Sequence, residues 1–431
     1  MKILFIVPYM PNLVRVRPYQ FIRSLSKRGH EVTVATLWVN DKEKQEISAL
    51  KPYCQEVIAF PIGKSQSFCN CLVALLGSSP LQSVYSWQPM LAQSVQKRIV
   101  SNKDKPGFDI VHVEHLRGVR YGLYIKLSGF NNQFIQPVVW DSVDSISHLF
   151  RQAAQQSTRQ LSRWITRFEL RRTERYEAWL LSQFEKVIVT SPKDKEAFCL
   201  LAAQADIHPY QNTTELLRDD RITVIPNGVD LEFFSPGKFE NRQHDTLVIS
   251  GKMSYHANTS MVLYFAQKVF PLVLAQHPQA KLVIAGKDPP GQVKNLMRNP
   301  AIQVTGEVQD MRPYIQTAAM AVAPVIYGAG IQNKVLEAMA CATPVVATPQ
   351  AVSALNTRAG VDLEVAASAE EMASIIITLL QNPQKRKALG EMGRCYVETH
   401  HTWDGAAAQL EAVYHEAIKT ANKSLSPSQC G

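Results

Sequence analysis

The amino-acid sequence predicts an α/β protein of two domains, each with a parallel β-sheet covered by helices on both faces. The chain has 431 residues, enough for two domains at roughly 100–200 residues per domain. Its 46% of hydrophobic and 19% of charged residues provide a buried core and exclude a disordered or fibrous chain. Short apolar segments alternate with helical segments throughout, which is the order that produces parallel sheets.

The first domain opens with a βαβ unit. An apolar strand is expected at residues 3–7, a helix at about 17–27 and a second strand at 31–35. The length between the two strands gives the crossover that a parallel pair needs. Further buried strands are expected at residues 57–60, 110–113, 138–140, 187–190 and 222–225.

Two segments of the first domain differ from the rest in composition. Residues 151–185 are rich in arginine and carry apolar residues at helical spacing, which predicts one or two amphipathic helices. Residues 69–76 form a short apolar segment with two open interpretations. It is either a helix of the core, or a segment that touches lipid or a lipid-linked acceptor beside a basic surface.

The domain boundary is predicted at residue 235, because turn-forming residues are dense between residues 226 and 237. The first domain is then 1–235 and the second 236–402. In the second, strands are expected at 246–250, 281–285, 302–304, 319–323 and 344–347, and helices at 258–276 and 332–340. In a pair of such domains, ligands bind in the crevice at the carboxyl ends of the strands.

The formal charge of +9 arises mainly in the first 235 residues, which hold 29 Lys and Arg against 22 Asp and Glu. This excess suits an anionic membrane surface, nucleic acid or an acidic substrate, and it equally suits an ordinary solvated surface. No nucleic-acid motif accompanies it, so no nucleic-acid partner is expected.

The cysteines and the hydropathy favour a cytoplasmic protein. The seven cysteines form no CxxC pair, which favours a reducing compartment over a disulfide framework or a zinc site. No stretch of about 18 apolar residues and no secretory signal is read from the sequence. Association with the inner face of the membrane stays open beside a purely cytoplasmic location.

The clearest candidate site is the segment 322–340, where a strand enters a loop with two glycines and then directly a helix. Glycines let a ligand approach the backbone, and a helix N-terminus offers unpaired N–H groups and a positive dipole end. Asn333, Lys334 and Glu337 share one face of the helix. The pattern indicates a phosphate site in which Glu337 accepts from a ribose diol. The alternative is a surface Lys–Glu pair at a helix entry.

Four motifs follow one another along the chain: Gly29-His30-Glu31-Val32, Ile225-Pro226-Asn227-Gly228-Val229-Asp230, Thr305-Gly306-Glu307-Val308, and residues 336–348 (LEAMACATPVVAT). In this order they resemble the family 4 (group 1) glycosyltransferases over nearly the whole chain. The resemblance implies a GT-B fold, with two facing Rossmann-like domains and a C-terminal helix, here about 403–421, that returns to the first domain. It also implies transfer of a sugar from a nucleotide-diphosphate donor with retention of configuration, without a metal or other cofactor.

The resemblance assigns the nucleotide site. Glu337 matches the second glutamate of the family's E-x7-E motif, which holds the ribose of the donor. Ala329 stands where the first glutamate is expected, and neither Gln332 nor Tyr327 occupies that motif position. The departure bears on recognition of the donor sugar.

The diphosphate site follows from the same resemblance. Lys252 matches the first member of a basic pair after the first strand of the second domain. No base stands near Ala257 or Asn258, where the second member would fall, and we infer that Lys334 supplies the missing charge. The expected donor-binding residues are Gly328, Ala329, Gly330, Ile331, Lys334, Glu337 and Val308.

His115 follows the strand at residues 110–113 and matches a histidine that the family aims at the donor sugar. From spacing alone, a single histidine at a strand end is more often structural. The resemblance favours the functional interpretation. The expected catalytic residues are therefore His115, Lys252 and Glu337, with no metal ligands.

Four residues are expected on the acceptor side. Arg15 and Arg17 follow the first strand, where the family meets its acceptor, and indicate an acceptor that carries phosphate or another anion. Asp141 and Asp144 follow the strand at 138–140. They either bind acceptor hydroxyls or cap the helix after them, and capping is the better supported of the two.

The sequence thus favours a glycosyltransferase that uses a nucleotide sugar and a carbohydrate or lipid-linked acceptor, in polysaccharide or glycolipid assembly. Ala329 supports an alternative, a non-catalytic nucleotide-sugar- or glycan-binding protein on the same fold. A nucleotide-sugar epimerase would need further acid–base carboxylates. A nicotinamide dehydrogenase would need a G-x-G-x-x-G loop after the first strand, where Pro8-Tyr9-Met10-Pro11 stands instead.

Overall fold

The computed structural model describes residues 1–99, 107–129, 136–156, 160–204, 221–327 and 330–425. The chain divides into two compact units, Met1–Pro226 with Ala406–Gly431, and Asn227–Gly405. The division lies nine residues ahead of the boundary predicted at 235. The reason is local: Val229 N donates to His401 O at 2.8 Å, and a Cβ on Gly228 would lie 2.7 Å from Trp403 N. The turn therefore packs on the end of the second unit.

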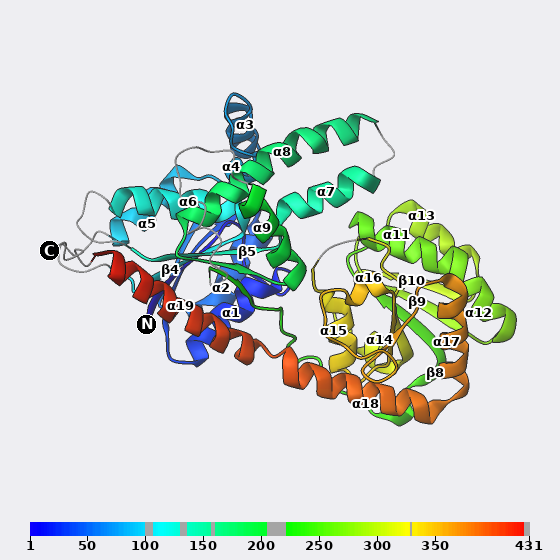
Figure 1. Ribbon diagram of the computed structural model, residues 1–431. Coiled ribbons are helices and arrows are strands. Elements are labelled where there is room, and N and C mark those ends of the chain that lie inside the picture. The colour runs from blue at the N-terminus through cyan, green and yellow to red at the C-terminus, as the bar shows by residue number, and fades with distance from the viewer. Residues whose placement is uncertain (100–106, 130–135, 157–159, 205–220, 328–329, 426–431) are drawn as a thin grey trace. The chain divides into compact units, whose positions relative to one another are not determined.

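Within its described residues, the first unit holds a seven-stranded sheet in the order β3-β2-β1-β4-β5-β6-β7 (Figure 1). All its neighbouring strands are parallel. The carboxyl ends of β1, β4 and β5 are consecutive at its centre. The strands are β1 (Lys2–Val7), β2 (Glu31–Trp38), β3 (Glu56–Pro61), β4 (Ile110–Glu114), β5 (Val138–Val143), β6 (Lys186–Val189) and β7 (Ile222–Val224).

Helices cover this sheet and continue beyond it. The arginine-rich segment forms α7 and α8, which confirms the prediction of amphipathic helices there. The helices are α1 (Val16–Lys27), α2 (Asp41–Leu50), α3 (Lys64–Leu75), α4 (Leu81–Tyr85), α5 (Pro89–Ile99), α6 (His115–Gly129), α7 (Ile146–Gln156), α8 (Gln160–Gln183), α9 (Pro192–Gln204) and α19 (Trp403–Leu425).

Close packing fixes where α6 begins. A Cβ on Gly122 would lie 2.9 Å from Phe184 Cε1, and one on Gly118 would lie 3.0 Å from Val113 Cγ1. Glycine at both places lets α6 lie close to β4, since tighter contacts are not tolerated in a packed interior. The start of α6, with His115, is thereby held at the carboxyl end of β4.

The C-terminal helix α19 packs on the first unit, as expected of the returning helix. Tyr414 OH lies 2.9 Å from His112 Nδ1 on β4. On the surface, Arg28 Nη2 lies 2.8 Å from Glu411 Oε2. Leu410 and Ala417 are buried, so the helix completes the core of this unit.

The second unit holds a six-stranded parallel sheet in the order β10-β9-β8-β11-β12-β13 among its described residues. The predicted helix at 258–276 is α11 and α12 joined by a π-helical stretch, Phe265–Val269. Strands are β8 (Gln243–Ser250), β9 (Lys281–Ala285), β10 (Ile302–Gly306), β11 (Ala318–Ala323), β12 (Val345–Ala347) and β13 (Glu364–Val365). Helices are α11 (His256–Tyr264), α12 (Phe270–Gln276), α13 (Gly291–Lys294), α14 (Arg312–Thr317), α15 (Asn333–Ala340), α16 (Pro349–Val352), α17 (Ala369–Gln381) and α18 (Pro383–His400).

The ends of β8 and β9 are held together by glycines. Gly286 has a φ of +148°, and a Cβ there would lie 1.7 Å from Gly251 O. Only glycine fits such a contact. The turn after β8, which carries Lys252, is therefore fixed against the end of β9.

One of the two interpretations of residues 69–76 is wrong. Residues 69–75 lie in α3 and Leu76 follows it directly, but the large apolar side chains here are not in the core: Phe68, Leu72 and Val73 are exposed, and Leu76 is 94% exposed. Burial in the core was expected from hydropathy, whereas α3 packs through its smaller residues. Among the described residues, no helix combines the length and apolar character needed to cross a bilayer.

Candidate active site

The start of α15 forms the first part of the site. Gly328 and Ala329 lie outside the described residues, so their expected donor contacts stay predictions. Gly330 has a φ of +78°, and Ile331 packs against the core where the loop enters the helix. Gln332 precedes α15 and makes no side-chain capping hydrogen bond. Val335 N donates to Gln332 O at 2.8 Å, so the N–H groups of Asn333 and Lys334 are the ones that can meet a ligand.

Lys334 is held beside this turn. Its Nζ donates to Asn258 Oδ1 at 2.9 Å and to Gln332 Oε1 at 3.2 Å. Asn258 Nδ2 in turn donates to Lys252 O at 3.0 Å. Asn258 stands where the second base of the predicted basic pair would fall, and it brings the Lys334 ammonium to that place.

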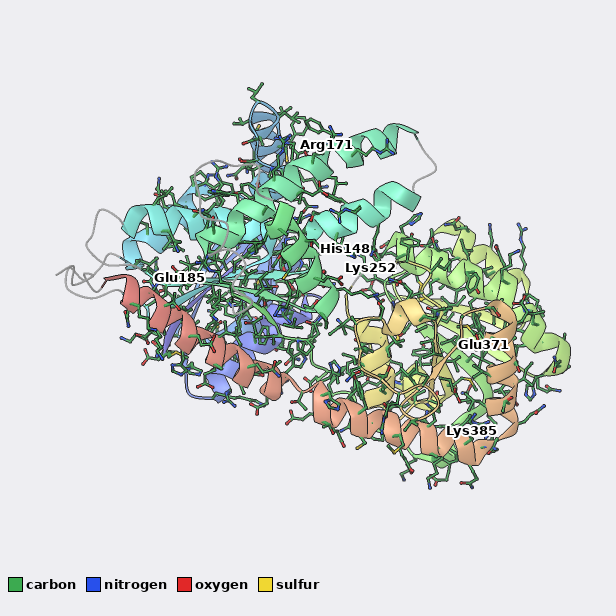
Figure 2. The ribbon with its side chains drawn as sticks, viewed as in Figure 1. His148, Arg171, Glu185, Lys252, Glu371 and Lys385 are labelled. Atoms are coloured by element: carbon green, nitrogen blue, oxygen red, sulfur yellow. The ribbon has the colours of Figure 1, made fainter. Side chains whose placement is uncertain are left out.

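Lys252 lies in the turn between β8 and α11, and its side chain is exposed (Figure 2). The turn is fixed by Asn258 and by Thr259 Oγ1, which donates to Met253 O at 2.6 Å. No ion pair between described residues engages the Lys252 ammonium. Two ammonium groups, one fixed and one exposed, therefore flank the same turn.

Glu337 lies one helical turn after Lys334. Burial raises the pKa of its carboxyl to about 7, against the opposing effect of Lys334. Burial lowers the pKa of Lys334 to about 8, against the effect of Glu337. At neutral pH the lysine is mostly charged and the glutamate is partly ionised. A bound cationic or hydroxyl group near Glu337 would favour its ionised form.

Other polar groups extend the site in the second unit. Asn227 Nδ2 lies 3.5 Å from Asn333 Oδ1, which ties the Pro-Asn-Gly turn to the start of α15. Tyr327 OH is hydrogen-bonded to His256 Nδ1 and lies 3.4 Å from Ser260 Oγ. Val308 is half-buried in the loop after β10, two strands away from β8.

In the first unit, His115 has the geometry of a functional residue. Its φ of +61° is unusual for a residue with a side chain and is often retained at active sites. Burial lowers its pKa to about 3, with a further effect of Arg117, so the ring is neutral. Its Nδ1 accepts from Arg117 N at 3.2 Å. The proton of the neutral ring is then on Nε2, which can donate one hydrogen bond.

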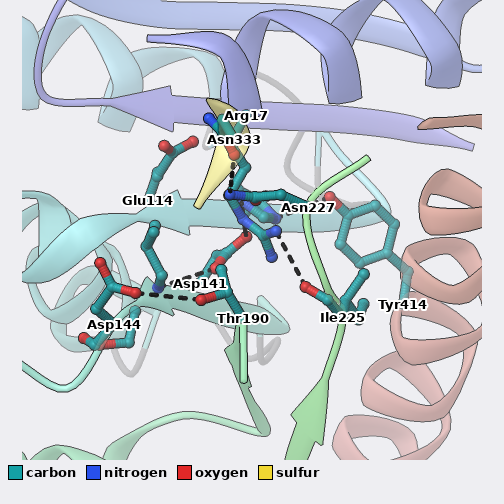
Figure 3. Close-up of polar contacts among 12 residues, drawn as sticks. Arg17, Glu114, Asp141, Asp144, Thr190, Ile225, Asn227, Asn333 and Tyr414 are labelled. Atoms are coloured by element: carbon teal, nitrogen blue, oxygen red, sulfur yellow. Dashed lines mark hydrogen bonds and ion pairs between the residues drawn. The ribbon is translucent and has the colours of Figure 1, made fainter. Parts of the chain in front are cut away.

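Arg17 lies in a buried ion pair, which differs from the exposed acceptor contact expected of it. Its Nε donates to Asp141 Oδ2 at 2.8 Å, and its Nη1 donates to Ile225 O at 3.0 Å (Figure 3). Its side chain is 5% exposed and that of Asp141 is fully buried. The pair joins the start of α1 to the ends of β5 and β7.

Arg15, in contrast, is 37% exposed. Its Nη1 donates to Met10 O at 3.3 Å and lies 3.2 Å from Glu43 Oε1. Its guanidinium carbon lies 4.9 Å from the centre of the Tyr9 ring. Of the two arginines expected on the acceptor side, Arg15 is the one a solute can reach.

Asp141 and Asp144 were expected to cap α7, but neither aspartate does. The N–H groups of Ile146 and Ser147 donate to Glu177 of α8, at 2.9 and 3.2 Å. Asp144 instead accepts from Thr190 Oγ1 at 3.1 Å. Burial raises the pKa of Asp144 to about 7, with a further effect of Asp194. Ser145 Oγ accepts from His148 N at 3.3 Å, so α7 is capped by a local serine and by Glu177 of a distant helix, and local spacing does not reveal the second.

The family models cover most of both units. Residues 14–233 match the model of Glycosyltransferase Family 4. Residues 244–382 match the model of Glycosyl transferases group 1. The chain belongs to glycosyltransferase family 4. The resemblance that its motifs carry is thereby confirmed.

Two curated relatives are similar to part of this family 4 chain. The GDP-mannose-dependent monoacylated alpha-(1-6)-phosphatidylinositol monomannoside mannosyltransferase of Corynebacterium glutamicum is 26% identical over 208 residues, 42% of this chain and 52% of that protein. The MMP alpha-(1->4)-mannosyltransferase of Mycolicibacterium hassiacum is 26% identical over 210 residues, 46% of this chain and 49% of that protein. The chain thus matches about half the length of each relative.

Solved structures share the fold over almost the whole chain. HepE of Anabaena, solved in complex with UDP, is 15% identical with a TM-score of 0.63 and covers 96% of this chain and 100% of that chain. The sucrose-phosphate synthase of Thermosynechococcus elongatus is 17% identical with a TM-score of 0.62, covering 97% and 99%. Two units with parallel sheets and this likeness identify the GT-B fold of family 4.

Sequence reasoning missed a polar cluster next to Asp141 in this family 4 chain. Tyr9 OH donates to Glu114 Oε1 at 2.8 Å. Burial raises the pKa of Glu114 to about 8, with a further effect of Asp141. His112, also buried, stacks on Phe5 with ring centres 3.9 Å apart, and burial keeps its pKa well below the usual value. The sequence could have indicated this cluster, because His112 and Glu114 are polar residues at alternate positions of the otherwise apolar strand β4.

Proposed function

We propose that this glycosyltransferase moves a hexose from a nucleotide-diphosphate sugar to a lipid-linked or carbohydrate acceptor, with retention of configuration and without a metal ion or other cofactor. The observation that carries the proposal is the Lys334 ammonium, held by Asn258 at the first turn of α15 beside Lys252. Two ammonium groups and free N–H groups at one helix start suit a diphosphate.

The chemistry follows from the charge of the leaving group. As the bond from the anomeric carbon to the diphosphate breaks, negative charge grows on the nucleoside diphosphate. Lys252, Lys334 and the N–H groups at the start of α15 would stabilise that charge. The fixed positions of Lys334 and of the backbone avoid reorganisation during the reaction. We assign Glu337 to the ribose hydroxyls. The acceptor oxygen bonds to the anomeric carbon on the face from which the diphosphate leaves, and the hydroxyl proton passes to the departing diphosphate oxygen.

His115 is proposed to bind the donor sugar. A neutral imidazole with its proton on Nε2 is a hydrogen-bond donor, suited to a sugar hydroxyl oxygen. Because its pKa is about 3, the ring stays neutral throughout the physiological range. It therefore positions the sugar by a hydrogen bond and does not act as an acid catalyst.

The acceptor side is proposed from charge. Arg15 is accessible and basic, which suits an acceptor that carries phosphate or another anion. The name of the Corynebacterium relative specifies a phosphatidylinositol monomannoside acceptor and GDP-mannose, and this supports a mannose donor and a lipid-linked acceptor here. Glycolipid or polysaccharide assembly at the inner face of the membrane, without nucleic acid, is the setting we propose.

The test is a screen of purified protein against GDP-mannose, UDP-glucose and other nucleotide sugars. Thermal shift finds the donor, because a ligand of the folded state raises the melting temperature. Transfer to a lipid extract is then followed by release of the nucleotide, and NMR of the product gives its anomeric configuration. A protein that binds a nucleotide sugar but neither hydrolyses nor transfers it is the non-catalytic alternative that Ala329 suggested. An inverted product would refute retention.

A further inference from the structure

Helix α3 packs with its small residues inward and its large apolar residues outward. Ser67 and Ala74 are buried against the unit, and Asn70 Nδ2 donates to Trp87 O at 2.9 Å. This arrangement is the reverse of a helix that covers a core with its apolar face. Its outward side chains are Phe68 (64% exposed), Leu72 (47%), Val73 (73%), Leu75 (49%) and Leu76 (94%).

Contacts with α8 hold α3 in this orientation (Figure 1). Arg172 of α8 donates to the carbonyl oxygens of Ala74 and of Gly77, the latter at 2.9 Å. Glu169 Oε2 accepts from Leu81 N at 2.9 Å. These bonds satisfy carbonyl groups at the C-terminal end of α3 and the backbone N–H of Leu81 at the start of α4. The outward apolar face is therefore a fixed part of the fold.

The charge around this face is positive. Residues 62–82 include Lys64 and no acidic residue. On the neighbouring helix α8, Arg167, Arg171 and Arg175 are exposed and recur every four residues, so they share one side (Arg171 is labelled in Figure 2). Apolar side chains next to a row of arginines are the combination that binds anionic lipid: the former enter the acyl boundary and the latter meet the phosphates.

We propose that this surface, made by Phe68, Leu72, Val73, Leu75 and Leu76 of α3 with Arg167, Arg171 and Arg175 of α8 and here called the α3 surface, binds an anionic lipid bilayer. A second copy of the chain fits less well, because a self-paired α3 surface would bring like-charged arginine rows together. The inference rests on the proposed lipid-linked acceptor and deepens it by naming the docking surface.

The test measures vesicle binding of the full chain, without any substrate. Sedimentation with phosphatidylcholine vesicles containing phosphatidylglycerol should show binding that weakens at high salt and is weaker with phosphatidylcholine alone. The L72S/L76S variant should lower the partition coefficient at least tenfold. R171Q/R175Q should lower it roughly 25-fold on anionic vesicles only, at about fivefold for each arginine near the surface.

Matched variants in the second unit serve as controls. L272S/M297S changes two exposed apolar residues, and K281Q/K294Q removes two exposed charges; both should bind vesicles like the wild type. Wild type that fails to sediment, or L72S/L76S that sediments fully, refutes the α3 surface. Concentration-dependent dimers that L72S/L76S abolishes, without vesicle binding, would assign the surface to self-association instead. Donor hydrolysis in solution should be unchanged in L72S/L76S. If neither the wild type nor any variant hydrolyses the donor, the proposed function is refuted and the α3 surface is not.

Discussion

Replacing Lys334 by methionine removes the charge that we assign to the diphosphate while keeping the length of the side chain. Two unit charges about 4 Å apart interact by about 4 kcal/mol at an effective dielectric constant of about 20. Lys334 is half-buried, and Lys252 and the α15 N–H groups remain, so we expect a loss of roughly 2–3 kcal/mol of transition-state stabilisation. By the relation of about 1.4 kcal/mol per factor of ten, kcat/KM should fall roughly 30- to 140-fold.

The assay is nucleotide release at several donor concentrations, with Lys294→Met as a control on an exposed lysine of the same unit. Because the reaction needs the charged form, kcat/KM should fall as pH rises through about 8, the pKa of Lys334. Lys334→Arg, whose charge persists, should extend activity to higher pH. K334M/N258K returns a base to the family's usual position and should regain part of the loss. Wild-type kcat/KM in K334M across this pH range would refute the reasoning.

Three further variants test the assignments. Glu337→Gln should weaken nucleotide binding roughly tenfold or more by calorimetry. The raised pKa of Glu337, about 7, gives stability at low pH that is lost as pH rises through that value. Urea unfolding should therefore find E337Q more stable than wild type by about 1–2 kcal/mol at pH 8.5. This difference in stability should shrink towards pH 5, and a difference that widens there would contradict the assignment. Arg17→Met leaves Asp141 buried without its ion-pair partner and should destabilise the fold by roughly 3–5 kcal/mol, so unchanged urea unfolding would be inconsistent with the buried pair. Arg15→Gln should raise KM for the acceptor with the donor KM unchanged, and an effect on the donor alone would remove Arg15 from the acceptor side.

The strands were predictable because parallel strands buried on both faces are largely continuous apolar segments, as in β1 and β11. The grouping of Asn333, Lys334 and Glu337 was predictable because the three residues share a helix face within one turn. Contacts across long sequence separations were not, since no local pattern specifies a partner. The Arg17–Asp141 pair and the capping of α7 by Glu177 are of this kind.

The side of α3 that faces the unit could not be predicted from the sequence for a related reason. Hydropathy alone could not decide whether the larger side chains face the core or lipid, whereas the contacts of Asn70 and Arg172 determine which side of this helix faces the unit. Asn258 is a similar case: its position in the sequence showed only that a base is missing. Its contact with Lys334 shows which residue brings a charge there.

The central end of the first sheet has three carboxyl groups and yet little net charge at neutral pH. Burial raises the pKa of Glu114 to about 8 and that of Asp144 to about 7, which favours their protonated forms, and the charge of Asp141 is balanced by Arg17. An anionic molecule that approaches this end therefore meets almost no electrostatic repulsion. Above about pH 8 the protons leave, and the same acids turn into an electrostatic barrier. The protonation of these buried groups thus gives the first unit a tolerance for anions that a count of its acidic residues would not suggest.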